Sequence, residues 1–158
     1  DGSSFYNIHD NACIYGFFKS SNQGGHAKAF HDNLSLWPAN GYCVWSFPGE
    51  LDGFPMPYWP NTGYEETYAN NTCVFDAGKL YLQYPSDCSL SNVTSIRAFN
   101  SNNTLYTPSG EGLVNTCRET LSFDEWKALG IDPHTTLVQK DLTTAEAIEM
   151  IRAKLFGF

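Results

Sequence analysis

Two His-Asp pairs, His9-Asp10 and His31-Asp32, recur 22 residues apart in the chain. Imidazole and carboxylate groups that meet in space can act as general acids and bases, or they can bind a metal ion. The same residues could instead be solvated, or could cap backbone groups beside a turn. Two later segments with the same surrounding pattern lack both residue types at this place. This favours the turn role, and we predict no metal site.

The other acidic groupings are Glu50 with Asp52, Glu65 with Glu66, and Asp76 with the basic Lys79. Paired carboxylates, or carboxylates that bind calcium beside a basic residue, are what sugar-cleaving enzymes need. If the chain is an enzyme, we expect Glu65, Glu66 and Asp76 to be catalytic, and calcium is then a candidate cofactor. None of these groupings has a diagnostic spacing, and the alternative is a solvated loop edge. We therefore assign no catalytic residue and no cofactor.

A segment over residues 47–64 combines four prolines and three glycines with many aromatic residues. This composition excludes a helix or a central strand and predicts a projecting loop. Flat rings on a stiff loop can stack on sugar faces. We therefore predict that this loop contacts glycan through Phe54, Tyr58, Trp59 and Tyr64. The alternative is that the loop folds back and packs its rings on the body of the protein.

An eight-residue pattern that recurs four times predicts the scaffold on which these residues are carried. It consists of a large apolar residue, two polar residues, Asn, any residue, a small Cys, Ser or Thr, an aliphatic residue and an aromatic residue. It occupies residues 8–15, 30–37, 68–75 and 99–106. The residues after the Asn favour a strand, and the Asn favours a sharp turn. Such a repeat is typical of stacked units.

Stacking of the units predicts two ladders of side chains. The repeated Asn residues should hydrogen-bond to one another at the strand spacing of about 4.8 Å. This structural Asn ladder would consist of Asn11, Asn33, Asn71 and Asn102. A second ladder would consist of the aliphatic residues Ile14, Leu36, Val74 and Leu105.

Over roughly residues 5–118 this pattern resembles the right-handed parallel β-helix, or pectate-lyase-like, superfamily. The resemblance implies an all-β fold: a solenoid of about four to five coils with a short C-terminal α-helical cap. A β-sandwich with Asn-rich loops is the alternative, but the strands of a sandwich do not usually repeat one sequence pattern four times.

The expected domain organisation follows from a change of composition after Thr120. Residues 1–120 would form the coils, with inserted loops at about 47–64 and 76–95. Residues 121–158 would form the cap, with a short helix after Ser122 and a second helix over about 144–156, each starting at a capping box. The apolar residues Ile148, Ile151 and Leu155 should share one face of the second helix. A separate small α module is the alternative.

Charge and hydropathy exclude two classes of partner. A formal charge of −8 without a run of basic residues argues against nucleic acid. No stretch reaches the ~20 apolar residues that a membrane span needs, so we expect no membrane insertion.

Cysteines and glycosylation signals point to an extracellular protein. The five cysteines form no C-x-x-C pair, which disfavours zinc and favours one or two disulfides. The Asn-x-Ser/Thr signals lie at Asn33, Asn70, Asn92 and Asn102. Asn33 and Asn102 should be bare because the ladder encloses them, whereas Asn70 and Asn92 should carry glycans.

These inferences favour a secreted, N-glycosylated β-helix protein with a structural or glycan-binding role in an extracellular matrix, wall or surface appendage. Its partner would be a polysaccharide or glycoconjugate. The resemblance also implies an alternative, the C-terminal part of a polysaccharide lyase or glycoside hydrolase. Nothing in residues 1–7 looks like a cap. We therefore expect further coils of a longer chain, or neighbouring copies, at the N-terminal end.

Overall fold

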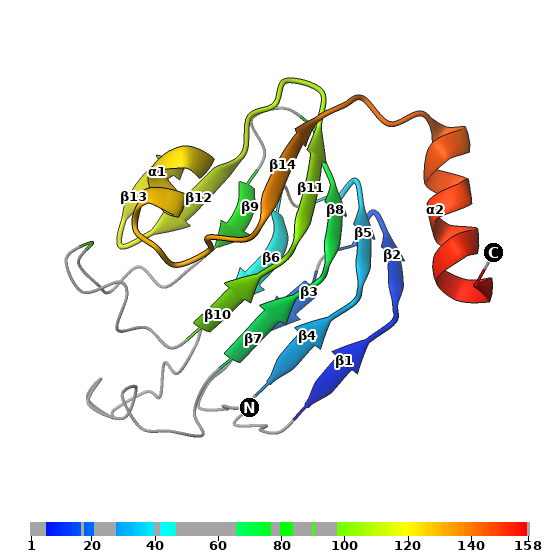
Figure 1. Cartoon of the computed structure of the whole chain (residues 1–158), viewed down its shortest axis with the longest axis horizontal. Helices are drawn as coiled ribbons and strands as arrows, with labels where there is room; N and C mark the ends of the chain where they lie inside the picture. The colour runs from blue at the N-terminus through cyan, green and yellow to red at the C-terminus, as the bar shows by residue number, and fades with distance from the viewer. Residues whose placement is uncertain are drawn as a thin grey trace.

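The structure is a computed structural model. It describes residues 6–16, 18–20, 28–39, 42–46, 66–76, 80–83, 90 and 98–157. These residues form fourteen strands and two helices (Figure 1). The predicted loop at 47–64 lies outside the described residues, and only part of the predicted loop at 76–95 lies within them.

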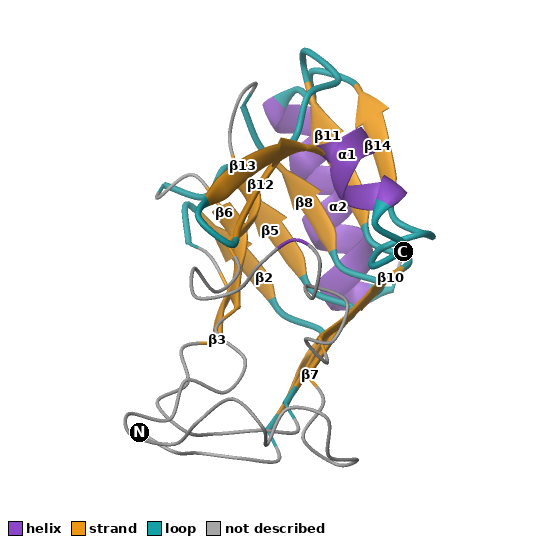
Figure 2. Ribbon diagram, turned by 90° about the vertical axis from the view of Figure 1, so that its left-hand side faces the viewer, coloured by secondary structure: helices purple, strands orange, loops and turns teal. Residues whose placement is uncertain are grey.

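The strands form three sheets, which Figures 1 and 2 show from two sides. Sheet A has the order β1 (Asn7–His9), β4 (Ala29–His31), β7 (Glu66–Ala69) and β10 (Ala98–Ser101). Sheet B has the order β14 (Thr136–Gln139), β11 (Thr104–Thr107), β8 (Thr72–Val74), β5 (Leu34–Leu36) and β2 (Ala12–Ile14). Sheet C has the order β13 (Glu119–Ser122), β12 (Leu113–Thr116), β9 (Leu80–Gln83), β6 (Tyr42–Ser46) and β3 (Phe18–Ser20).

Each repeat contributes its first strand to sheet A and its second strand to sheet B. The first two repeats pair in parallel, with Ile8 opposite Phe30 and Ile14 opposite Leu36. β14 adds a fifth parallel strand to sheet B from the region after the repeats. The two sheets therefore meet along the turns that carry the repeated Asn residues.

Sheet C is mixed, because β13 pairs antiparallel with β12. The reversal occurs at Cys117 and Arg118, whose φ angles are 48° and 63°. Two successive residues with positive φ are the mark of a tight hairpin turn that matches the twist of its strands. After β12, which pairs parallel with β9, the chain thus turns back in a hairpin and adds no further parallel strand to sheet C.

The expected right-handed parallel β-helix is therefore wrong. In the part of the chain that the structure describes, two parallel sheets and one mixed sheet combine with two helices, and a closed solenoid of several coils is not formed. Two features produce the difference. One is the hairpin of sheet C, and the other is the position of the second helix.

The interior strand β5 of sheet B is buried on both faces, whereas Ile14 of the edge strand β2 is 50% exposed. Cys73 and Leu105 pack in one core cluster with the aromatic residues Phe75 and Trp126. Val74 packs on the opposite face, in a second cluster. Successive side chains of a strand point to opposite faces, so this division follows from the strand geometry. The expected aliphatic ladder is wrong at its fourth position, because Leu105 pairs with Cys73 and Tyr106 pairs with Val74.

Both helices begin at the capping boxes that the sequence predicts. Helix α1 (Phe123–Ala128) has Ser122 as its N-cap, and α2 (Thr144–Phe156) has Thr143. Trp126 of α1 is fully buried in the first core cluster. Helix α1 packs against the β12–β13 hairpin.

Helix α2 lies along sheet B beside β2 and β5 (Figure 1), not over the end of the stack. Ala147, Met150 and Ile151 pack against the second core cluster. The predicted apolar face is correct only at Ile151, since Ile148 and Leu155 are 43% and 51% exposed. The helix therefore covers the part of this second face that lies around β2 and β5.

Candidate functional site

Six of the predicted site residues lie outside the described residues: Phe54, Tyr58, Trp59, Tyr64, Glu65 and Asn92. Glu66 begins β7. Asp76 follows β8 and is exposed to solvent. The site that the structure does build lies elsewhere, at the turns between sheets A and B.

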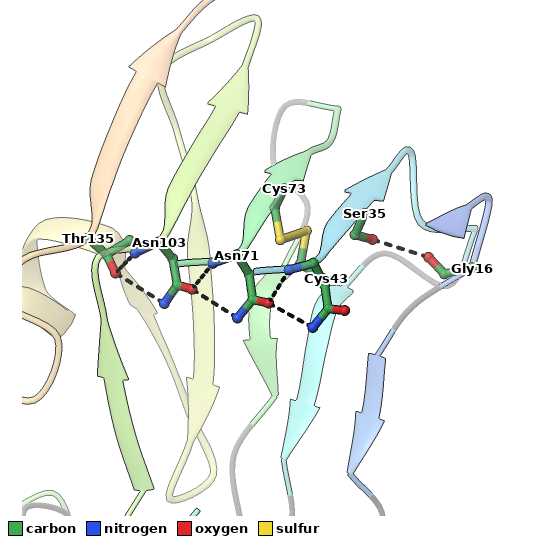
Figure 3. Close-up of a disulfide and its surroundings, with 8 residues drawn as sticks. Gly16, Ser35, Cys43, Asn71, Cys73, Asn103 and Thr135 are labelled. Atoms are coloured by element: carbon green, nitrogen blue, oxygen red, sulfur yellow. Dashed lines mark hydrogen bonds between the residues drawn. A yellow bond between two sulfur atoms is a disulfide. The ribbon is translucent and has the colours of Figure 1, made fainter. Parts of the chain in front are cut away.

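A row of hydrogen-bonded side chains runs through these turns from the exposed Asn11 to Thr135, and its members from Asn33 onward are buried. The Nδ2 group of Asn11 donates to Oδ1 of Asn33 at 3.1 Å, and Asn33 donates to Asn71 at 3.1 Å. Asn71 donates to Asn103 at 3.1 Å, and Asn103 donates to Oγ1 of Thr135 at 3.3 Å. We call these five residues the inner row. Figure 3 shows its second half.

Each rung of the inner row is reinforced by backbone groups. Oδ1 of Asn71 also accepts the backbone N–H of Asn33 at 3.0 Å, and Oδ1 of Asn103 accepts that of Asn71 at 2.9 Å. The second Nδ2 proton of Asn71 goes to the carbonyl of Phe30 at 3.0 Å. The amide is therefore saturated, as a buried polar group must be. Removing it would leave several buried donors and acceptors without a partner.

The inner row corrects one position of the predicted ladder. Asn103, not Asn102, takes the place beside Asn71, because Thr104 pairs with Thr72 and not with Cys73. The fourth repeat is thus displaced by one residue. The tripeptide Asn-Asn-Thr stands at both 70–72 and 102–104 and gives this register in the sequence.

The residue before each inner-row Asn lies on the surface, in a strained backbone conformation. These residues are Asp10, Asp32, Asn70 and Asn102, with φ angles of 58°, 55°, 55° and 54°. We call them the outer row. Asp and Asn tolerate the left-handed region better than other residues with a side chain. In the first three repeats the sharp turn therefore occurs one residue before the Asn to which the sequence assigns it, whereas in the fourth repeat it occurs at the assigned residue, Asn102.

The two predicted His-Asp pairs meet at the first two turns. The rings of His9 and His31 stack with their centroids 5.0 Å apart and an interplanar angle of 8°. Their Nδ1 atoms lie 2.7 Å from Asp10 and 2.5 Å from Asp32. Nε2 of His31 also lies 2.7 Å from Oδ1 of Asn7. Both ring nitrogens of His31 are thus engaged by neighbouring side chains, so the ring has a structural role at these turns.

Helix α2 brings a lysine to the same surface. Nζ of Lys154 donates to Oδ1 of Asp10 at 2.6 Å. This hydrogen bond, followed by the one with His9, lowers the pKa of Asp10 to about 2. Asp10 therefore remains a carboxylate near neutral pH, and it joins α2 to the first turn.

A groove of about 280 Å³ separates α2 from the turns. Its lining residues are Asp32, Asn33, Leu34, Asn70, Thr72, Met150, Ala153 and Lys154. Outer-row side chains form one wall and α2 forms the other. The groove therefore offers a carboxylate, amides and an ammonium group beside an apolar surface.

A second cavity, of about 610 Å³, lies beside α1. Its lining residues are Gly110, Glu111, Gly112, Leu113, Ser122, Phe123, Asp124, Lys127 and Leu137. Nζ of Lys127 donates to the carbonyl of Thr135 at 3.1 Å and lies over the Phe123 ring. The cation of this cavity is thus engaged in stabilising the end of the inner row.

A disulfide joins Cys43 of β6 to Cys73 of β8, with the two Cα atoms 6.0 Å apart (Figure 3). It links sheet C to sheet B across the core. Cys117 also takes part in a disulfide, and Cys13 is a free thiol. Cys13 and Cys73 stand two strands apart, on either side of Ser35. A disulfide of this kind fits an oxidising, extracellular environment.

Three side chains of the site were missed by sequence reasoning: Asn103, Thr135 and Lys154. The repeated Asn-Asn-Thr signal could have found Asn103. Thr135 closes the inner row and donates to the buried Asp132 at 2.5 Å. It stands outside the repeats, and the contact of Lys154 depends on where α2 packs, so neither has a local signal.

The described residues contain no group of three or more His, Cys, Asp or Glu side chains that could hold a metal ion. Neither α1 nor α2 is long and apolar enough to cross a membrane. No family model, curated protein or solved structure matches the chain.

Proposed function

We propose that the protein is a secreted, N-glycosylated structural protein of an extracellular matrix, wall or surface appendage, which also contacts polysaccharide. The observation that carries this proposal is the inner row. It uses the side chains of the four repeated turns to hold parallel strands together. The amide oxygen and the amide nitrogen of each central Asn are both hydrogen-bonded. The residues that recur in every unit thus stabilise the stacked parallel strands.

The disulfide between Cys43 and Cys73 supports the extracellular setting. A covalent bond between two sheets stabilises a domain in an environment where thiols are oxidised. The low content of charged residues, 16%, and the aromatic content of 15% agree with a protein that works at a surface of neutral polymers.

Polysaccharide contact is proposed for Phe54, Tyr58, Trp59 and Tyr64 from their sequence context alone. Rings on a proline-rich segment offer flat apolar faces at a small cost in side-chain entropy. The segment lies in the chain between β6 of sheet C and β7 of sheet A, so these two sheets would anchor its ends.

The experiment compares retention of the secreted protein on immobilised polysaccharides with that of the double variant Tyr58→Ala/Trp59→Ala. We expect weaker retention of the variant with unchanged thermal unfolding, because neither ring would belong to the core. A matched control is Tyr15→Ala, which removes a ring that is 68% exposed on the described surface. Equal loss of retention in both variants would mean non-specific contact and would contradict the assignment.

The same material tests the structural role against catalysis. We expect no cleavage of uronate-containing or neutral polymers, with or without calcium. Turnover that disappears on substitution of Glu65, Glu66 or Asp76 would overturn the proposal and make the protein a polysaccharide-cleaving enzyme. Unchanged retention after the aromatic substitutions would remove glycan contact and leave a purely structural role.

A further inference from the structure

We propose that Asn102 is an N-glycosylation site, and that it forms with Asn70 a pair of adjacent glycan attachment points on the outer row. The inference rests on the proposed secretion of the protein. It reverses the expectation from sequence, which placed Asn102 inside the ladder and therefore without a sugar.

The register of the sheets places Asn102 outside the inner row. Ser101 pairs with Ala69 and Thr104 pairs with Thr72, so Asn102 takes the same place in its turn as Asn70 does in the preceding one. Both residues have left-handed backbone conformations, and both side chains are exposed. Each begins the sequence Asn-Asn-Thr, so each satisfies the Asn-x-Thr requirement.

The hydrogen bonds of the amides separate the sites that can carry a sugar from the one that cannot. Both Nδ2 protons of Asn33 are used, one with the carbonyl of Ile8 at 3.0 Å and one with Oδ1 of Asn71 at 3.1 Å. A glycosylated amide keeps only one N–H, so a sugar on Asn33 would break one of these buried bonds. Within the described part of the chain, Asn70 and Asn102 make no such side-chain bond.

The chemical step places the sugar on a nitrogen that the fold does not use. The co-substrate is a lipid-linked oligosaccharide pyrophosphate. The bond between C1 of its first sugar and the pyrophosphate oxygen breaks, and a bond between C1 and Nδ2 of Asn102 forms. Nδ2 loses one proton to a base of the transferase, and the lipid pyrophosphate leaves. Oδ1 and the remaining N–H stay available to solvent.

The two attachment points differ in their surroundings. Asn70 lines the groove opposite Met150 and Ala153 of α2, whereas Asn102 is outside that lining. The backbone N–H of Asn70 donates to the carbonyl of Ser101 at 3.1 Å, which fixes the two turns side by side. Two glycans would therefore leave the same edge of the molecule from neighbouring strands and cover the outer row beyond α2.

The test is site-specific mapping of the full chain, secreted from eukaryotic cells behind a cleavable leader. Digestion with peptide N-glycosidase in heavy-oxygen water converts each glycosylated Asn to a labelled Asp. We expect label at Asn70 and Asn102 and none at Asn33. The variant Thr104→Val, which removes the hydroxyl of the signal, should lose the label at Asn102 only, and Thr104→Ser should retain it.

A second measurement ties the modification to the folded protein. Non-reducing peptide mapping should find the Cys43–Cys73 disulfide in molecules that carry the glycan on Asn102. Absence of label at Asn102, or label confined to molecules without this disulfide, would overturn the proposal. Because the leader forces entry into the secretory pathway, these results do not depend on where the protein naturally resides. Secretion itself is tested separately, by locating the natural protein.

Discussion

The ammonium group of Lys154, near the end of α2, lies 2.6 Å from the carboxylate of Asp10, which stands 144 residues earlier in the chain. The contact joins the last helix to the first turn of the outer row. Lys154 also lines the groove between α2 and the turns. Helix α2 is thus fixed at its far end by a charge and along its length by the apolar cluster around Ala147.

Acid should weaken this contact in a defined pH range. The pKa of Asp10 is about 2 in the folded protein, below the value of about 3.9 in an unfolded chain. Because the folded value is the lower one, the stabilisation is fully present above the unfolded pKa and is lost as the pH falls from about 4 to about 2. Urea unfolding across this range should show a smaller loss of stability for Asp10→Asn than for the natural protein.

A second carboxylate titrates in the same range and provides the control. The pKa of Glu146 is also about 2, chiefly because of its hydrogen bond with Lys140 and then those with Thr143. Glu146→Gln should remove a separate part of the acid sensitivity, and the double variant should show the sum. An Asp10→Asn variant as acid-sensitive as the natural protein would contradict the role of the Lys154 contact.

The register of the fourth repeat predicts opposite results for two neighbouring residues. Asn103→Ala should lower the free energy of unfolding by roughly 2–4 kcal/mol, since it leaves the buried N–H and Nδ2 of Asn71 without their acceptor. Asn102→Gly should change it by less than about 0.5 kcal/mol, because glycine accepts the positive φ and the side chain is exposed. Equal losses in urea denaturation would mean that the register is wrong.

The disulfide between Cys43 and Cys73 closes a separation of 30 residues. Loop-closure entropy gives such a bond a contribution of roughly 3.6 kcal/mol to stability. The variant Cys43→Ser/Cys73→Ser should therefore lose about this amount in chemical denaturation. Cys13→Ser is the matched control, since it removes a free thiol and should cost clearly less. A double variant as stable as the control would show that the bond does not constrain the unfolded chain.

Removal of the fully buried Trp126 ring should destabilise the protein more than any change on α2. Trp126→Ala leaves a cavity in the core cluster with Phe75 and Leu105, at an expected cost of about 3–5 kcal/mol. Leu155→Ala, at a position that is 51% exposed, should cost far less. Melting temperatures of the two variants give the comparison, and similar shifts would contradict the assignment of the core.

Local signals in the sequence were sufficient for the strands of the repeats and for both helix starts. The capping boxes at Ser122 and Thr143 need only residues three positions apart, so their prediction did not depend on the rest of the fold. The first three turns pair in the expected register, with Ala12 opposite Leu34 and Leu34 opposite Thr72.

The remaining features depend on contacts that no local pattern encodes. The turn at Cys117 and Arg118 uses two residues that rarely adopt positive φ, so the sequence has no Asn-Gly signal for a hairpin. The apolar residues of α2 are spread around the helix, and only packing on sheet B selects Ala147 and Ile151. The fourth repeat contains two successive Asn residues, and the eight-residue pattern fits the wrong one.

The inner row joins residues that are 22, 38 and 32 positions apart by the same pair of hydrogen bonds. The hydrogen bonds between successive Asn residues therefore do not depend on the number of residues that connect them. A longer connection costs only about 0.6 kcal/mol for each doubling of its length. Evolution, or a protein engineer, could therefore exchange whole connecting segments while each hydrogen-bonded pair of Asn residues keeps its place.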